Sequence, residues 1–205
     1  MNEEKLLFGT FNRHKFTEAA AILAPTTLVC AADLPHLHEP EETGDTLEQN
    51  ATLKARHYHR LTGLPCFADD TGLEVAALNG APGVRSSRFA HPDVGDRANR
   101  RKLLSLLSRP SPARFRTVVA FFDGGEIRLF DGILDGTVIL EERGDGGFGY
   151  DPVFVPEGCD RTLAELSAQE KNALSHRKRA LDKFAAFLND RRRNQFAQIG
   201  ADAHP

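Results

Sequence analysis

Two groups of carboxylates stand where a metal ion can be held. One is in a polar, loop-like stretch, and the other follows a short apolar run that predicts a strand. The first group is Glu41, Glu42 and Asp45, and the second is Asp69 and Asp70. Mg²⁺ is usually bound by one or two carboxylates and by substrate phosphates. Because strand side chains alternate, we expect one of the two aspartates to bind metal and the other to brace the backbone. Two solvated acidic loops are the alternative.

A candidate anion site lies near the start of the chain. The apolar run 6–8 predicts a buried strand, and Asn12 can cap a helix that extends to about Leu23, before Pro25. Free N–H groups and the positive end of the helix dipole favour an anion there, and Lys15 adds a full charge. The Walker spacing Gly-x-x-x-x-Gly-Lys is absent. An ordinary capped helix with a solvated lysine is therefore the alternative.

Two later segments can contact the rest of a ligand. Residues 144–149 are rich in glycine, which lets backbone approach a ligand closely, and Phe148 or Tyr150 can stack on a base. The proline after Asp151 keeps the Asp151 backbone extended, so that its carboxylate can contact a base edge. The basic stretch 171–179 suits a triphosphate. A flexible hairpin turn and a solvated basic helix are the alternatives.

The elements that must position these groups are a mixture of helices and strands. Capping-box patterns at Thr46-x-x-Gln49 and Ser167-x-x-Glu170 each predict a helix start. A further helix is expected over 96–107, and strands over 66–68, 115–122 and 126–140. The last helix carries one apolar stripe, formed by Leu174, Leu181, Phe184 and Leu188. Without an internal repeat or linker, residues 1–193 are expected to form one unit, and residues 194–205 a polar C-terminal tail.

The composition excludes several classes of protein. A net charge of −3 leaves no broad basic field for a nucleic-acid backbone, and no stretch reaches the roughly 20 apolar residues of a membrane span. The acidic start lacks a signal-peptide pattern, and three separated cysteines suggest neither a disulfide framework nor a zinc site. The His-x-His pairs at 36–38 and 57–59 do not suggest a metal site either. We therefore expect a cytoplasmic protein.

Taken together, the candidate segments resemble the inosine triphosphate pyrophosphatase family, also called the dITP/XTP pyrophosphatases. Five motifs, spread from Leu6 to about Leu188, carry the resemblance. In chain order they are Thr10-x-Asn12-x-x-Lys15, Glu41-Glu42-Thr43-Gly44-x-Thr46-Leu47-x-x-Asn50-Ala51-x-x-Lys54-Ala55, Ala68-Asp69-Asp70-Thr71-Gly72-Leu73-x-Val75-x-x-Leu78-Asn79-Gly80-Ala81-Pro82-Gly83, Gly146-Gly147-Phe148-Gly149-Tyr150-Asp151-Pro152 and Ala164-Glu165-Leu166-x-x-x-x-Lys171-Asn172-x-x-Ser175-His176-Arg177.

The resemblance implies an elongated α/β fold, with a central mixed sheet flanked by helices and two lobes around a nucleotide cleft. It implies a homodimer that uses Mg²⁺ to hydrolyse the non-canonical purine nucleoside triphosphates ITP, dITP and XTP to monophosphate and pyrophosphate. Asp70 matches the catalytic aspartate and a metal ligand, and Glu41 matches the metal-binding glutamate. The matching substrate contacts are Thr10, Phe11, Asn12, Arg13, His14, Lys15, Thr71, Phe148, Gly149, Tyr150, Asp151, Lys171, His176 and Arg177.

Three residues depart from the family pattern. Phe11 stands where glycine is common, Thr71 where serine is usual, and Phe89 where a tyrosine is more familiar. None of them removes a carboxylate or a cation. In the implied reaction, Asp70 orients or deprotonates a water that attacks the α phosphorus, and His176 and Arg177 donate to the 6-oxo group. A nucleotide-binding regulator without turnover, a nucleic-acid-binding module and a pyrophosphatase for modified pyrimidines are the alternatives.

Overall fold

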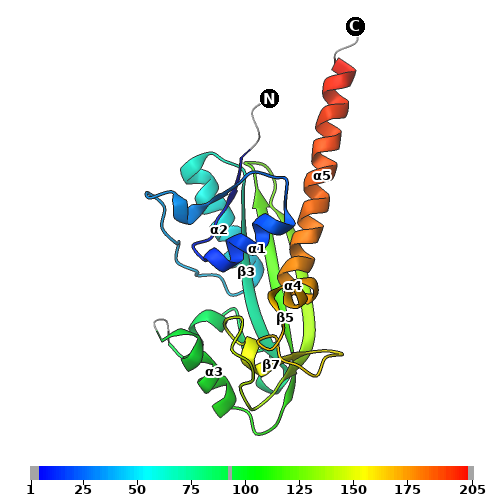
Figure 1. Cartoon of the computed structure of the whole chain (residues 1–205). Coiled ribbons are helices and arrows are strands. Elements are labelled where there is room, and N and C mark those ends of the chain that lie inside the picture. Colours follow the sequence, from blue (N-terminus) through cyan, green and yellow to red (C-terminus); the bar gives the residue numbers. More distant parts are fainter. Residues whose placement is uncertain (1–4, 92–93, 203–205) are drawn as a thin grey trace.

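The computed structural model describes residues 5–91 and 94–202, in which a twisted mixed sheet extends along an elongated molecule (Figure 1). The strands are β1 (Leu6–Phe8), β2 (Leu28–Cys30), β3 (Cys66–Val75), β4 (Pro82–Gly83), β5 (Ser111–Phe122), β6 (Arg128–Val138) and β7 (Phe154–Pro156). The helices are α1 (Arg13–Ile22), α2 (Leu47–Thr62), α3 (Gly95–Ser105), α4 (Ala168–Leu174) and α5 (His176–Asp202). The strand order is β2-β1-β3-β5-β6-β7, and β4 pairs with β3.

One edge of β3 is left open in its middle. β1 pairs with β3 in parallel only as far as Phe67, and β4 pairs antiparallel with β3 from Leu73. On its other edge, β3 is paired with β5 along its whole length. Ladder pairing on the open edge is thus interrupted at residues 68–72, which include both adjacent aspartates. Side chains from both faces of the sheet can meet a ligand at this gap.

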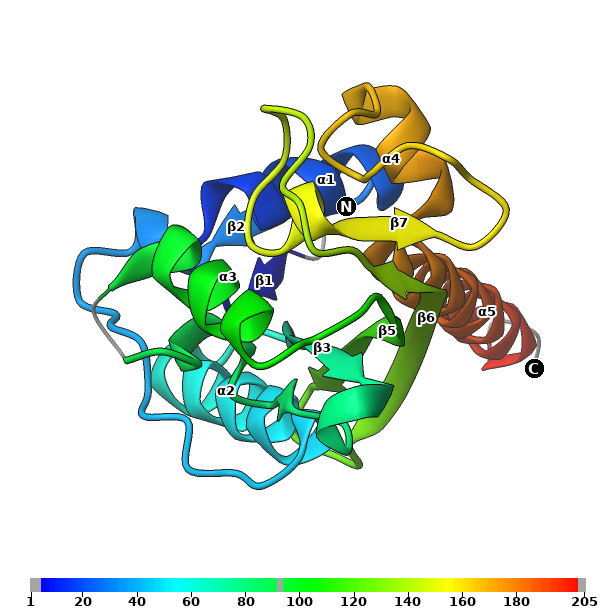
Figure 2. The ribbon, with the colours of Figure 1, turned by 90° about the horizontal axis from the view of Figure 1, so that it is seen from below.

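The two faces of the sheet are covered by different helices. Phe67 and its cross-strand neighbour Phe121 pack with α1 and α5 on one side, called here the α5 face. Ala68 and Ala120 pack under α2 on the other side, called the α2 face. Figure 2 shows α2 and α5 on opposite sides of β3 and β5. Large residues under α1 and α5 and small ones under α2 follow the period-two alternation of a strand.

The same long strands also build a second core in the lower half of Figure 1. Leu73 and Val75 of β3, with Phe115 of β5, pack there against Phe154 of β7 and Leu103 of α3. The α5 face is therefore covered twice, by α1 and α5 in one half, and by α3 and the segment around β7 in the other. The two lobes expected from the sequence are confirmed, and the strands pass through both.

Helix starts match the sequence-based expectations closely. Asn12 caps α1 by accepting from the N–H groups of His14 and Lys15, and Ser167 and Glu170 form the reciprocal capping box of α4. At α2 the box is half formed, because Thr46 accepts from the Gln49 N–H while the Gln49 side chain accepts from Asp45 instead of Thr46. A short polar side chain at each start thus satisfies N–H groups that have no partner within the helix.

Four expectations about elements were wrong. Residues 66–75 form one continuous strand, so that Asp69 and Asp70 lie within β3 and not at a strand end. The last predicted helix is two helices, α4 and α5, separated by the extended Ser175. Asp151 begins the short 3-10 helix Asp151–Val153, so its backbone is not extended as expected from the following proline. Separately, α5 continues to Asp202 and so includes residues 194–202 of the expected C-terminal tail. Within residues 5–91 and 94–202, no helix is both long and apolar enough to cross a bilayer.

Candidate active site

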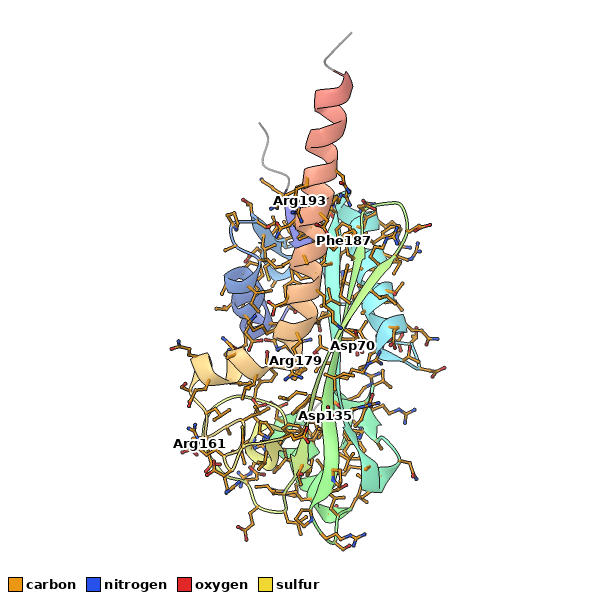
Figure 3. All side chains as sticks on the ribbon, turned by 90° about the vertical axis from the view of Figure 1, so that its right-hand side faces the viewer. Asp70, Asp135, Arg161, Arg179, Phe187 and Arg193 are labelled. Atoms are coloured by element: carbon orange, nitrogen blue, oxygen red, sulfur yellow. The ribbon has the colours of Figure 1, made fainter. Side chains whose placement is uncertain are left out.

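A cavity of about 590 Å³ opens at the gap in the edge of β3, between the two lobes. Its size is that of a pocket for a small organic ligand. Figure 3 places Asp70 near mid-height, with Phe187 above it and Asp135 below. Thirteen of the sixteen residues that the family resemblance assigns to the site line the cavity: Thr10, Asn12, His14, Lys15, Asp70, Thr71, Phe148, Gly149, Tyr150, Asp151, Lys171, His176 and Arg177. Phe11, Arg13 and Glu41 do not.

Asp69 projects from the α5 face into a buried cluster of charges. Its two carboxylate oxygens accept from Lys15 Nζ at 3.0 Å and from Arg177 Nε at 3.2 Å, and Arg177 also donates to Glu18 at 2.6 Å. Burial opposes ionisation of Asp69, but the positive charges of Lys15 and Arg177 outweigh it and lower its pKa below the ordinary value. Asp69 thus ties the start of α1 to the start of α5, as a bracing role requires.

Asp70 projects from the opposite face of β3, toward α2. Lys54 Nζ donates to one oxygen at 3.1 Å, and Asn50 Nδ2 donates to the other at 3.3 Å. Asn50 and Lys54 are four residues apart, and therefore lie on one face of α2. Burial raises the pKa of Asp70, the charge of Glu42 adds to the effect, and Lys54 opposes it. A carboxyl with a raised pKa next to a cavity is suited to accept a proton.

The acidic loop contributes Glu42 to the cavity and leaves Glu41 outside it. Glu42 accepts from Lys54 Nζ at 2.8 Å and from an Arg88 nitrogen at 2.7 Å, whereas the Glu41 side chain is exposed. Lys54 lies between Glu42 and Asp70, and these two carboxylates raise its pKa despite burial, which alone would lower it. The sequence-based assignment of Glu41 is thus not supported by this geometry, which favours its neighbour Glu42.

In the loop before α1, some residues stabilise the helix start beside the cavity, and others turn away from it. Thr10 accepts from the Asn12 N–H at 3.1 Å, and Asn12 is occupied as the helix cap. Phe11 packs into the core beside Tyr58, and Arg13 points outward to Asp33 at 2.6 Å. Two of the six residues expected to bind substrate here therefore turn away from the cavity. Phe11 is accommodated where the family commonly has glycine because its side chain is directed into the core and not into the cavity.

The glycine-rich segment presents one aromatic ring and buries the other. Phe148 is half buried, with Lys171 Nζ 4.4 Å from its ring centre. Tyr150 is in the lower core, and its hydroxyl donates to the Ser86 carbonyl at 2.8 Å. Asp151 is buried and accepts from the Phe148 N–H at 2.8 Å and from Lys171 at 2.6 Å. Phe148 is therefore the ring able to stack on a base, and Asp151 braces the loop.

Gly147 makes this loop geometry feasible. Its φ of +72° is in the left-handed region, which disfavours side chains, and a Cβ there would lie 2.1 Å from an oxygen of Asp151. α3 holds the next glycine, Gly149, by both of its backbone groups. Asp96 accepts from the Gly149 N–H and Arg100 donates to the Gly149 carbonyl, each at 2.7 Å. The loop is thus held on two sides.

Known proteins resemble this chain along most of its length. Residues 6–187 match the Ham1 family, which is most of the chain. The chain belongs to the Ham1 family. A dITP/XTP pyrophosphatase of Porphyromonas gingivalis is 47% identical to it over 195 residues, covering 90% of this chain and 97% of the relative. One of Elusimicrobium minutum is 45% identical over 192 residues, covering 88% of this chain and 98% of the relative.

Solved structures of Ham1 proteins share the fold. The HAM1 protein of Coxiella burnetii superposes with a TM-score of 0.84 at 37% identity, covering 91% of this chain and 98% of that one. The Ham1 protein of Staphylococcus aureus gives 0.84 at 34% identity, covering 91% and 99%. The resemblance inferred from the sequence motifs is confirmed, as is the elongated α/β fold with a mixed sheet.

Several residues in and around this Ham1 cavity were not assigned roles from the sequence. Lys54 and Asn50 hold Asp70, and Arg88 holds Glu42. A polar pair four apart on the buried face of α2 was the available signal for the first two. Arg88 had no such signal, because its partner is 46 residues away in the chain. Thr117 was also missed, although it is a polar residue on the inward-facing register of β5.

Proposed function

We propose that this Ham1 protein hydrolyses non-canonical purine nucleoside triphosphates (ITP, dITP and XTP) to the monophosphate and pyrophosphate. The arrangement at the gap in β3 is the main support, because a carboxyl with a raised pKa, cations and an accessible aromatic ring line one cavity. Relatives named dITP/XTP pyrophosphatase, 45–47% identical over about nine-tenths of the chain, support the same reaction. Such an enzyme is a hydrolase that removes deaminated purines from the nucleotide pool.

The triphosphate would lie along the α1 side of the cavity. Lys15 and the positive end of the α1 dipole offset phosphate charge there, and Arg177 adds a buried charge behind them. Asp69 holds both cations in place before a ligand arrives. Preorganised charge of this kind stabilises a phosphoryl-transfer transition state without reorganisation during the reaction.

Mg²⁺ would be held by Asp70 and a glutamate of the acidic loop. The donor set fits, because Asp70 and Glu42 both line the cavity and share Lys54, while Asp69 is neutralised by Lys15 and Arg177. Two carboxylates with substrate phosphates are a common ligand set for Mg²⁺, so the lack of a three-residue cluster among the described residues does not count against it. When bound, the ion neutralises phosphate charge and lowers the pKa of a bound water.

Asp70 would act as the proton acceptor. Its raised pKa suits transfer of a proton from the attacking water, and Lys54 and Asn50 keep its carboxylate oriented. The water oxygen forms a bond to the α phosphorus. The bond from that phosphorus to the α–β bridging oxygen breaks, and pyrophosphate leaves with the electron pair. Lys15 stabilises the charge of the leaving group.

Base selectivity would come from His176 and Phe148. Phe148 offers a stacking surface, and His176 lines the same cavity. The Arg177 nitrogens that donate within the protein are directed at Asp69 and Glu18. His176 is therefore the better placed of the two expected donors to contact a 6-oxo group. An adenine amine would leave that donor unpaired, which costs binding energy.

A homodimer and a cytoplasmic location complete the proposal. Light scattering of the purified protein tests the first, and a mass of one chain contradicts it. The cysteines of the described residues are unpaired, which agrees with a reducing compartment. Fractionation of the native cells tests the second, and recovery outside the cytoplasm contradicts it.

A substrate panel tests the reaction itself. Pyrophosphate release is measured with ITP, XTP, GTP, ATP and dUTP, with Mg²⁺ and with a chelator. We expect release with ITP and XTP in the presence of Mg²⁺ and little with the other three. Tight ITP binding without release would indicate a regulator, and preference for dUTP would indicate a pyrimidine enzyme. Activity that survives the chelator would contradict the metal assignment alone.

A further inference from the structure

Two hydroxyl groups, one of them buried, connect β3 to α5 at the base of the cavity. Thr117 on β5 is fully buried and directly opposite Thr71 on β3, with 2.8 Å between the two Oγ1 atoms. The Thr117 Oγ1 is also 2.6 Å from Nδ1 of His176, at the start of α5. Thr71 and His176 both line the cavity, whereas Thr117 lies behind them. Thr117 therefore contacts the site only through its two neighbours.

The His176 ring is held in one orientation. Phe115 stacks on it with ring centres 4.9 Å apart and an angle of 21° between the planes. Gly132 of β6 lets the start of α5 approach closely, since a Cβ there would be 2.0 Å from the His176 carbonyl oxygen. Burial, with the positive charges of Arg177 and Lys171, lowers the pKa of His176 well below its ordinary value. These contacts thus position the ring, and its lowered pKa favours the neutral form.

A neutral histidine carries one ring hydrogen, and its partner at one nitrogen determines what the other nitrogen can do. If Thr117 donates to Nδ1, the hydrogen is on Nε2, which can donate to an oxygen. If Nδ1 donates to Thr117, Nε2 can only accept. Nε2 has no hydrogen-bond partner among the described residues, which leaves it available to a ligand. The direction of the hydrogen bond between Thr117 and Nδ1 therefore determines whether Nε2 can pair with an acceptor or with a donor on the edge of a base.

We propose that Thr117 is a specificity-determining positioning residue, whose hydroxyl donates to Nδ1 and so keeps the hydrogen of His176 on Nε2. Nε2–H then donates to the 6-oxo oxygen of hypoxanthine or xanthine. The opposite tautomer would accept from the 6-amino group of adenine. In the proposed direction, Thr71 donates to Thr117, and the lone pairs of the Thr71 oxygen stay free toward the cavity. This inference rests on the proposed function, because only a 6-oxo substrate requires a donor here.

The Thr117→Val variant tests the proposal, because valine keeps the shape and removes the hydroxyl. We expect the ratio of kcat/KM for ITP to that for ATP to fall at least about tenfold, the equivalent of ~1.4 kcal/mol. Thr117→Ser keeps the hydroxyl and retains the wild-type ratio. Thr162→Val is the matched control, because Thr162 is equally buried but lies outside the cavity. We expect Thr162→Val to leave the ratio unchanged.

NMR of the ring nitrogens gives a second, independent readout. In the ligand-free wild type, we expect the His176 hydrogen on Nε2, and in Thr117→Val a mixture of tautomers. A hydrogen on Nδ1 in the wild type overturns the proposal, and so does a folded Thr117→Val variant with the wild-type ratio. The wild-type spectrum remains decisive if Thr117→Val does not fold. If the wild type does not hydrolyse ITP, the proposed function fails, whereas the NMR result still reports on the tautomer.

Discussion

Asp69 and Asp70 are adjacent in the chain, yet they point to opposite faces of β3 and are held by different lysines. Asp69 binds Lys15 and Arg177 on the α5 face, and Asp70 binds Lys54 on the α2 face. The alternation of a strand enforces this separation. Both carboxylates border the cavity, but Asp69 is paired with two cations and has a lowered pKa, whereas the pKa of Asp70 is raised.

The first prediction concerns Asp70. Asp70→Asn removes the proton acceptor and a metal ligand, and we expect kcat/KM for ITP to fall at least about a hundredfold. Thermal unfolding should confirm that the variant is folded. Asp135→Asn changes an exposed aspartate on β6, below Asp70 in Figure 3 and outside the cavity lining, and should keep wild-type activity. Full ITP hydrolysis by Asp70→Asn would refute the catalytic assignment.

The second prediction separates Glu41 from Glu42. Glu42→Gln weakens the hold on Lys54 and Arg88 and removes a cavity carboxylate, so we expect activity to need about ten to a hundred times more Mg²⁺. Glu41→Gln changes an exposed neighbour and should leave the Mg²⁺ titration close to wild type. A larger effect from Glu41→Gln than from Glu42→Gln would return the metal ligand to Glu41.

The third prediction concerns stability. Asp69→Asn leaves Lys15 and Arg177 without their shared carboxylate, and breaking a buried ion pair costs about 3–5 kcal/mol. Asp131→Asn breaks an exposed pair with Lys183 and should cost under about 1 kcal/mol. Urea unfolding of both variants measures the free energy of unfolding. Equal losses would show that Asp69 does not brace the two helices.

The fourth prediction concerns pH. The pKa of His176 in the folded chain is well below 6.5, its value when unfolded, so the unfolded state binds more protons between these two values. The contribution to stability is complete above about pH 6.5 and falls as the pH falls toward the folded pKa. His176→Asn should therefore reduce the loss of Tm between about pH 7 and pH 5. His36→Asn, at an exposed position, is the control and should lose as much Tm as the wild type. Identical Tm losses for the wild type and both variants would contradict a neutral His176.

The fifth prediction concerns the contact between α3 and the glycine-rich loop. Arg100→Met removes the donor to the Gly149 carbonyl and loosens the loop that carries Phe148. We expect KM for ITP to rise several-fold with a smaller change in kcat, because the loop positions the base and not the phosphates. Arg101→Met, at an exposed neighbouring position, is the control and should change neither constant. An unchanged KM in Arg100→Met would exclude this positioning role.

Local signals in the sequence were sufficient for much of the fold. Asn12 and Ser167 cap the helices they were expected to cap, because a cap depends on residues within one turn. The alternation around Asp69 and Asp70 also followed from local geometry. The family motifs then located the cavity, since thirteen of the expected site residues line it.

The remaining features depend on contacts between distant parts of the chain. Glu42 and not Glu41 lines the cavity, and Glu42 contacts Arg88, which is 46 residues away. The extended Ser175 that separates α4 from α5 is followed by His176, whose partner Thr117 is 59 residues away. The sequence shows each residue type but not which distant partner it meets. Tertiary packing decides such pairs, so the structure was needed to find them.

The three long strands each contribute side chains to both cores. β3 places Phe67 in one core and Leu73 in the other, and β5 does the same with Phe121 and Phe115. No cut in the chain therefore yields two complete halves. Neither lobe can serve as an exchangeable module between relatives, and fragments produced separately would each lack part of their own interior. The two lobes must therefore be produced and engineered together, as one chain.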